Sequence, residues 1–144
     1  MSEQLFHIGI KAMVEDTDGR LLLFKQDVSH NHSMPTAAYW DFAGGRVNVD
    51  ETSMLETLRR EIQEETGIDD YDSAELFTTV ISNHQIKLPN DQLIGLALVI
   101  YKVKLKPNAQ IILSDEHTNY EWLDRSEAKA RLAHKYPAKF TDML

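Results

Sequence analysis

One stretch decides the fold: residues 45–68, which read GRVNVDETSMLETLRREIQEETGI. Apolar side chains recur within it at helical spacing, which predicts a helix over 53–66. These apolar residues are Leu55, Leu58 and Ile62. A hydroxyl at Thr52 or Ser53 can cap the start of this helix, and Gly67 stands where a glycine commonly closes one. The stretch therefore predicts a single well-bounded helix.

Three carboxylates gather toward the end of this helix. Glu61, Glu64 and Glu65 stand at i, i+3 and i+4, so a helix places them on one side, about a quarter-turn from the apolar stripe. Such a cluster is most often a solvated face, and like charges cost roughly 0.2–0.5 kcal/mol per adjacent pair. A divalent cation such as Mg²⁺ would offset that repulsion, and Gly44 and Gly45 supply backbone that a ligand can approach closely.

Strand-like segments lie on both sides of the helix. We predict strands over 6–14, 21–24, 39–43, 75–82, 93–105 and 120–123, a hairpin turn over 15–20, a loop over 26–38, and a second helix over 126–133 capped by Ser126. This order favours a mixed α/β or α+β sandwich over a doubly wound parallel fold. No repeat, linker or low-complexity tract divides the sequence, so we expect one domain over 1–144.

The composition excludes several classes to which the protein could otherwise belong. The chain has no cysteine, which excludes disulfides and thiolate metal sites, and it has neither an apolar run of membrane-spanning length nor a secretory signal. A cytoplasmic location with no membrane contact is expected. The net charge of −8 argues against binding a nucleic-acid polymer. It would also repel a phosphate substrate, unless bound cations reverse the charge locally.

The ordered string over 45–68 resembles the Nudix box, G-x5-E-x7-R-E-U-x-E-E-x-G-U, in which U is bulky and apolar. The matching residues are Gly45, Glu51, Arg60, Glu61, Ile62, Glu64, Glu65, Gly67 and Ile68. The resemblance covers roughly 6–123, although only the box is highly specific. It implies a Nudix-type α/β/α sandwich with a mixed β-sheet and a central catalytic helix, and a pyrophosphohydrolase that cuts a phosphoanhydride bond.

The sequence departs from the box at one place. Eight residues, 52–59, separate Glu51 from Arg60, where the pattern has seven. Either the loop before the helix contains an additional residue, or the helix itself absorbs it. We favour the loop near 48–51, because helices accommodate insertions poorly. The roles of Gly45 and Glu51 are accordingly less firmly assigned than those of the three helix glutamates.

The resemblance also implies roles for individual residues. The Mg²⁺ or Mn²⁺ ligands would be Glu61, Glu64, Glu65, Glu116 and a carbonyl of Gly45 or Gly44. Arg60 would orient the glutamates. The general base stays open among Glu51, Glu65 and Glu116. Glu116 is included because it follows the apolar run 111–113, where a strand is expected to end, and because it precedes Trp122 at a family-like spacing. Asp115 is its alternative.

Substrate contacts are expected from Arg46, Tyr39 and His84, although aromatic residues in a strand are more often core. The partner would be a small nucleotide-type molecule, either a nucleoside diphosphate linked to another group or a nucleoside triphosphate, and a homodimer is possible. Zinc at His30 and His32 is disfavoured because no cysteines accompany them. The alternative function is a non-catalytic Nudix-fold binding or regulatory module.

Overall fold

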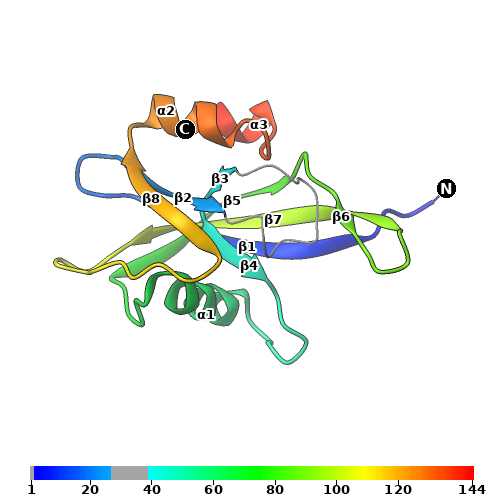
Figure 1. Cartoon of the computed structure of the whole chain (residues 1–144), viewed down its shortest axis with the longest axis horizontal. Helices are drawn as coiled ribbons and strands as arrows, with labels where there is room; N and C mark the ends of the chain where they lie inside the picture. Colours follow the sequence, from blue (N-terminus) through cyan, green and yellow to red (C-terminus); the bar gives the residue numbers. More distant parts are fainter. Residues whose placement is uncertain (1, 27–38) are drawn as a thin grey trace.

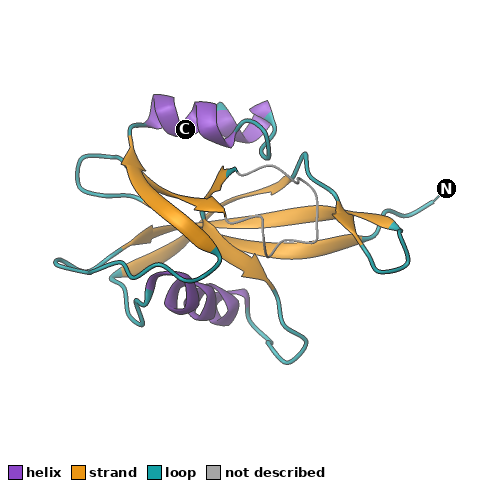
Figure 2. Cartoon of the chain, in the orientation of Figure 1, coloured by secondary structure: helices purple, strands orange, loops and turns teal. Residues whose placement is uncertain are grey.

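A computed structural model describes residues 2–26 and 39–144 of the chain. Two β-sheets lie in the middle, with α1 on one side and α2 and α3 on the other (Figures 1 and 2). The elements are β1 (Phe6–Val14), β2 (Leu21–Gln26), β3 (Trp40–Asp41), β4 (Ala43–Arg46), α1 (Met54–Thr66), β5 (Ser73–Ile81), β6 (Ile86–Lys87), β7 (Leu93–Lys104), β8 (His117–Leu123), α2 (Arg125–Leu132) and α3 (Ala138–Thr141). The predicted mixed α+β sandwich is confirmed.

The larger sheet is mixed. Its strand order is β4-β1-β7-β5, with the short β6 also paired to β7. The β1 and β7 strands run parallel, whereas β4 and β5 pair antiparallel to their neighbours. The smaller sheet has the order β3-β2-β8 and is antiparallel. Helix α1 packs on β4 and β1, and α2 packs on the smaller sheet, which gives the layered arrangement.

The segment predicted as one strand over 39–43 is in fact two strands in different sheets. Trp40 and Asp41 pair with β2 in the smaller sheet. Ala43 to Arg46 pair with β1 in the larger one, so Gly45 lies opposite Ile10. Phe42 links the two strands and is fully buried. The single-strand prediction was wrong because the chain changes sheets at one residue, Phe42, and no glycine or proline within 39–43 marks the change.

Helix α1 begins and ends as its sequence predicts. The Ser53 hydroxyl accepts a hydrogen bond from the Leu55 N–H, and Gly67 adopts a left-handed φ of 74° with its N–H bonded to the Gln63 carbonyl. The apolar stripe was only partly right. Leu58 and Ile62 are buried, whereas Leu55 is 49% exposed. The buried face of the helix is rotated toward its acidic residues, because that face meets β4 and β1.

The C-terminal third differs from the prediction in detail. Strand β8 starts at His117, earlier than expected, and residues 111–113 are not a strand. Helix α2 is capped by the Asp124 side chain, which accepts from the Glu127 N–H, rather than by Ser126. The short α3 was not predicted. No helix in the described ranges is long and apolar enough to cross a membrane.

Candidate active site

The end of α1 meets the glycine turn of β4. The Gly44 N–H donates to Oε2 of Glu65 at 2.6 Å. A Cβ on Gly45 would overlap the carboxylate of Glu61, so that carboxylate lies directly against the backbone of Gly45. Gly44 has a φ of 150°, and a side chain there would collide with the Ile10 carbonyl. Gly44 therefore requires glycine, whereas a side chain at Gly45 would displace the Glu61 carboxylate, and each position faces one box glutamate.

The three predicted acids fall into two environments. The side chains of Glu61 and Glu65, one helical turn apart, are only 10% and 5% exposed, whereas that of Glu64 is 53% exposed. Burial raises the pKa of Glu65 well above its ordinary value, against the opposing charge of Lys11. Burial also raises the pKa of Glu61, against the field of Arg60. Two carboxylates that are costly to ionise without a cation thus lie side by side.

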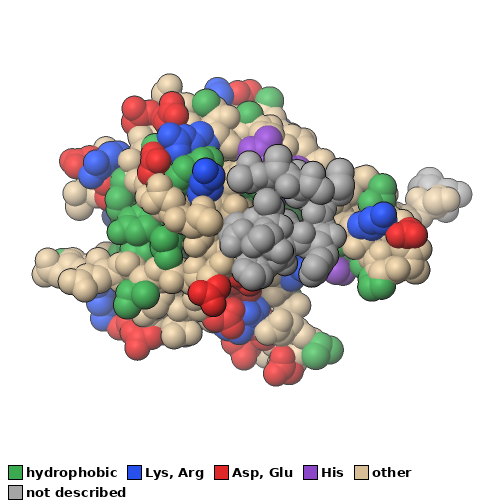
Figure 3. Space-filling view, in the orientation of Figure 1, with side chains coloured by type: hydrophobic (Ala, Val, Ile, Leu, Met, Phe, Trp, Pro, Cys, Tyr) green, Lys and Arg blue, Asp and Glu red, His purple; other side chains and the backbone are tan. Residues whose placement is uncertain are grey.

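Arg60 is hydrogen-bonded to several residues of the box. Its guanidinium donates to Glu61 Oε1 at 2.8 Å and to Glu64 Oε2 at 3.1 Å. It also contacts both oxygens of Glu51 and the carbonyl of Arg46. Acidic and basic side chains adjoin over the α1 side of the molecule (Figure 3). Arg60 therefore lies where it was expected to orient the glutamates.

The additional residue of the box lies in the loop before α1. The helix is regular α-helix from Met54 to Thr66, with no π-turn. Glu51 nevertheless reaches Arg60, and it accepts further hydrogen bonds from the Thr57 hydroxyl and the Asn48 N–H. Hydrogen bonds from Arg60, followed by that from Asn48, lower the pKa of Glu51 to about 2. A carboxyl group with so low a pKa is a poor proton acceptor near neutral pH.

The loop that precedes β8 brings Glu116 and His117 close to Glu65. Glu116 is exposed, and its charge contributes to the raised pKa of Glu65, so the two carboxylates are electrostatic neighbours. His117 is buried against the Phe24 ring, with 5.0 Å between ring centroids. Its Nε2 lies 3.7 Å from Oε1 of Glu65. Burial lowers the pKa of His117 to about 4, so this imidazole is neutral at neutral pH.

A buried ionic cluster beneath the glycine turn was not predicted. Asp41 accepts from Lys135 Nζ at 2.5 Å and from the Tyr136 hydroxyl at 2.6 Å, and Lys11 Nζ lies 3.0 Å from it. Burial opposes the ionisation of Asp41, yet the two ammonium groups hold its pKa well below the usual range. Burial lowers the pKa of Lys135 to about 8. A lysine within the apolar run of β1 was the one sequence signal of this cluster.

Two of the three expected substrate contacts lie together. The Tyr39 ring meets the His84 and His134 rings edge-on, at centroid separations of 5.5 and 5.0 Å. Nδ1 of His134 lies 3.3 Å from Nε2 of His84. The charge of Glu65 is one cause of the raised pKa of Tyr39, after burial and Asp41, so this aromatic group is near the acidic site.

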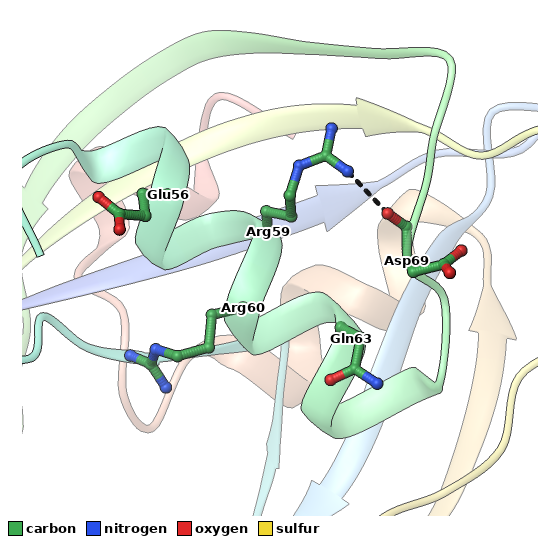
Figure 4. Close-up of a pocket in the computed structure, with 5 residues that line it drawn as sticks. All are labelled: Glu56, Arg59, Arg60, Gln63 and Asp69. Carbon is green, nitrogen blue, oxygen red and sulfur yellow. Dashed lines mark hydrogen bonds between the residues drawn. The ribbon is translucent and has the colours of Figure 1, made fainter.

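The third expected contact has a different neighbour. The Arg46 guanidinium contacts Nδ1 of His7 at 3.0 Å, and no hydrogen bond between described residues joins it to Tyr39 or His84. His30 and His32 fall outside the described residues. Another feature of the surface is a shallow depression on the outer side of α1 (Figure 4). It is lined by Glu56, Arg59, Arg60, Gln63 and Asp69, and the Arg59 guanidinium donates there to the Asp69 carbonyl at 2.7 Å.

The donor set at the glycine turn suits a hard divalent cation. Two buried carboxylates with raised pKa values and a closely approached glycine backbone offer the oxygen ligands that Mg²⁺ and Mn²⁺ prefer. Within the described ranges, no three acidic or histidine side chains already converge as a complete ligand set. Arg60 and the Gly44 N–H instead engage the carboxylates. The residues fit a metal whose binding requires small side-chain movements.

Solved structures of other proteins share this fold. A MutT protein from Methanosarcina mazei is 26% identical, with a TM-score of 0.70 over 99% of this chain and 92% of its own. The dihydroneopterin triphosphate pyrophosphohydrolase of E. coli is 20% identical, with a TM-score of 0.66 over 89% and 88%. The NUDIX domain of Shewanella oneidensis NrtR, complexed with ADP ribose, is 18% identical, with a TM-score of 0.60 over 91% and 79%. The last two show a shared fold.

No curated protein matches the chain. The NUDIX domain family, by contrast, matches residues 5–144. Together with the MutT protein above and a MutT NUDIX hydrolase from Burkholderia pseudomallei that is 25% identical, this match supports a Nudix pyrophosphohydrolase. The resemblance inferred from the box is confirmed: the chain belongs to the NUDIX domain family.

Proposed function

We propose that this chain hydrolyses a phosphoanhydride bond in a small nucleotide-type molecule and that the reaction requires Mg²⁺ or Mn²⁺. One observation supports this most directly. Glu61 and Glu65 are buried side by side against Gly44 and Gly45, where their charge repulsion and desolvation call for a cation. Glu64 and Glu116, at the exposed edge of the same site, would complete the ligand set.

Glu61 and Glu65, with Glu64 and Glu116 at the edge, would hold the metal, which would supply positive charge against the phosphates and make a water a better nucleophile. The chain's own residues would do the rest. Arg60 holds Glu61 and Glu64 in place and would release them in part to the metal. The Gly44 N–H fixes one oxygen of Glu65 and leaves the other to face the site.

The general base is better sought at Glu65 or Glu116 than at Glu51. Glu51 is committed to Arg60 through two hydrogen bonds, and its pKa of about 2 suits an anchor rather than a proton acceptor. Glu65 has a raised pKa, which brings it nearer the range in which a base works. Glu116 is solvent-exposed and can meet a water directly.

The part of the substrate beyond the phosphates would lie toward Tyr39 and His84. These side chains, joined by His134, form an aromatic and polar wall within the electrostatic range of Glu65. Such a wall suits a planar heterocycle better than a polymer backbone. We keep nucleoside triphosphates and nucleoside diphosphate derivatives as the two substrate classes, and Arg46 as a candidate phosphate contact.

The test is a panel of nucleotides incubated with the protein and Mg²⁺ or Mn²⁺, with released phosphate or pyrophosphate measured. Glu65→Gln keeps size and removes charge, and its turnover should fall at least about a hundredfold. Glu56→Gln makes the same change at the exposed start of the same helix and should stay within about twofold of wild type. If no nucleotide is cleaved with either metal, the chain is a binding module and the proposal is wrong.

A further inference from the structure

Among the described residues, one buried side-chain nitrogen has no hydrogen-bond partner, and it is Nε2 of His117. The side chain is 0% exposed, so bulk solvent does not reach this atom. An unpaired buried polar group is destabilising, and such groups are rare enough to need a reason. The nearest carboxylate oxygen in an ion-pair geometry is Oε1 of Glu65, at 3.7 Å.

The other side of the imidazole determines where its proton lies. The Ser114 hydroxyl lies 3.5 Å from Nδ1 of His117 and itself faces the N–H of Glu116 at 3.4 Å. Because that N–H donates to the hydroxyl oxygen, the hydroxyl proton is free to point at Nδ1. A neutral imidazole that accepts at Nδ1 carries its proton on Nε2. The proton therefore faces Glu65.

We propose that His117 is a positioning residue for Glu65, donating from Nε2 to Oε1 when Glu65 binds a metal ion. The proposal rests on the metal-dependent function proposed above. The separation must shorten by about 0.8 Å to reach an ordinary hydrogen bond near 2.9 Å. With the Gly44 N–H on Oε2 and His117 on Oε1, the carboxylate plane would be fixed from both ends.

This arrangement would also couple the two acidic parts of the site. His117 follows Glu116 directly, and Ser114 contacts both of them. A histidine held by one polar neighbour and oriented toward a metal-binding carboxylate is a typical outer-shell partner, whose loss costs about 10–100-fold in metal affinity or activity. His117 would thus set the orientation of Glu65 and the position of Glu116 through one short loop.

The experiment measures Mn²⁺ binding to the metal-free protein by titration calorimetry, with no nucleotide present. His117→Leu fills the space but removes the donor, and its Mn²⁺ affinity should fall about 10–100-fold. His117→Gln places an amide N–H near the position of Nε2 and should stay within about threefold of wild type. Ser114→Ala should weaken Mn²⁺ binding several-fold, because the imidazole proton is then no longer directed to Nε2. Thermal unfolding of each metal-free variant reports its folding.

The outcomes separate the two proposals. A wild-type protein that binds no Mn²⁺ overturns the metal-dependent function and the inference with it. A wild type that binds Mn²⁺, beside a folded His117→Leu of equal affinity, overturns the inference alone. Equal losses in His117→Leu and His117→Gln also overturn it, because the imidazole would then act as something other than a hydrogen-bond donor. If His117→Leu does not fold, an unchanged affinity in Ser114→Ala decides against the proposal.

Discussion

Arg60 and Glu51 form a two-pronged ion pair. Arg60 Nε donates to Glu51 Oε2 at 2.8 Å, and Nη2 donates to Oε1 at 3.0 Å. The Glu51 side chain is only 6% exposed and the Arg60 side chain 25%, so the pair is partly shielded from solvent. The pair holds the loop before α1 against the helix, which explains how eight intervening residues are accommodated without distorting the helix.

Replacing Arg60 by lysine should therefore disturb the site, although lysine keeps the positive charge. A lysine ammonium cannot make two parallel hydrogen bonds to one carboxylate. We expect turnover in Arg60→Lys to fall about 10–100-fold, the size of effect usual for partners that orient metal ligands. Arg59→Lys, the same change on the outer side of α1, should leave turnover within about twofold. Equal activity in both variants would contradict the orienting role.

The sequence predicted α1 well because local signals agree there. Ser53, Gly67 and the spacing of Leu58 and Ile62 all act within the helix itself. It could not predict how the helix is rotated, because that depends on β4, which lies elsewhere in the chain. The rotation buries Glu61 and Glu65 and exposes Leu55, contrary to the apolar stripe.

The ionic cluster around Asp41 could not be predicted from the sequence either, because its members come from distant parts of the chain. Lys11, Asp41 and Lys135 come from β1, β3 and the segment after α2, and no local pattern links them. A hydrogen bond between residues 94 positions apart is a product of tertiary structure alone. The sequence suggested Tyr39 and His84 as substrate contacts from their side-chain types and missed His134, which contacts His84 although 50 positions separate the two residues.

Gly45→Ala should impair the site with little effect on the fold. The added Cβ overlaps the Glu61 carboxylate and displaces it, whereas the backbone φ of Gly45 is not in the left-handed region. We expect Mn²⁺ affinity and turnover to fall at least about tenfold. The matched control is Gly19→Ala, where φ is 80° but nothing lies within 4 Å of the new Cβ. It should lose about 1 kcal/mol of unfolding free energy and keep its activity. If Gly19→Ala lost activity and Gly45→Ala kept it, the placement of Gly45 at the metal site would be wrong.

Asp41→Asn should strongly destabilise the protein. It leaves the Lys11 and Lys135 ammonium groups buried without their counter-charge, a loss of about 3–5 kcal/mol in unfolding free energy. Asp142→Asn is the control, because Asp142 pairs with Lys129 at the surface and such pairs contribute at most about 1 kcal/mol. Urea denaturation of both variants measures the difference. Similar losses would mean that the cluster is not a stabilising feature.

His84 should make stability depend on pH. Burial, then the charges of Lys135 and His134, lower the pKa of His84 from 6.5 to about 4 in the folded protein, while Asp41 acts in the opposite direction. The unfolded chain therefore binds a proton more readily, and stability rises with pH across this window. The contribution is complete above about pH 6.5 and is lost as the pH falls toward 4. Thermal midpoints of wild type and His84→Gln should diverge from pH 4 to 6.5 and run parallel above it.

Glu116 should belong to the reaction although it lies 51 positions after Glu65 in the sequence. It is exposed at the start of β8, and its charge already acts on Glu65. As a metal ligand, its neutralisation in Glu116→Gln should raise the Mg²⁺ concentration needed for half-maximal turnover. If Glu116 is instead the general base, the same change should lower kcat and remove the acidic limb of its pH profile.

Asp115→Asn, one residue away and also exposed, is the control and should behave like wild type in both measurements. If Asp115→Asn shows the loss and Glu116→Gln does not, the role moves one residue along the loop. If neither variant changes either measurement, the proton must be taken within the box, with Glu65 before Glu51, because Arg60 keeps Glu51 ionised and occupied.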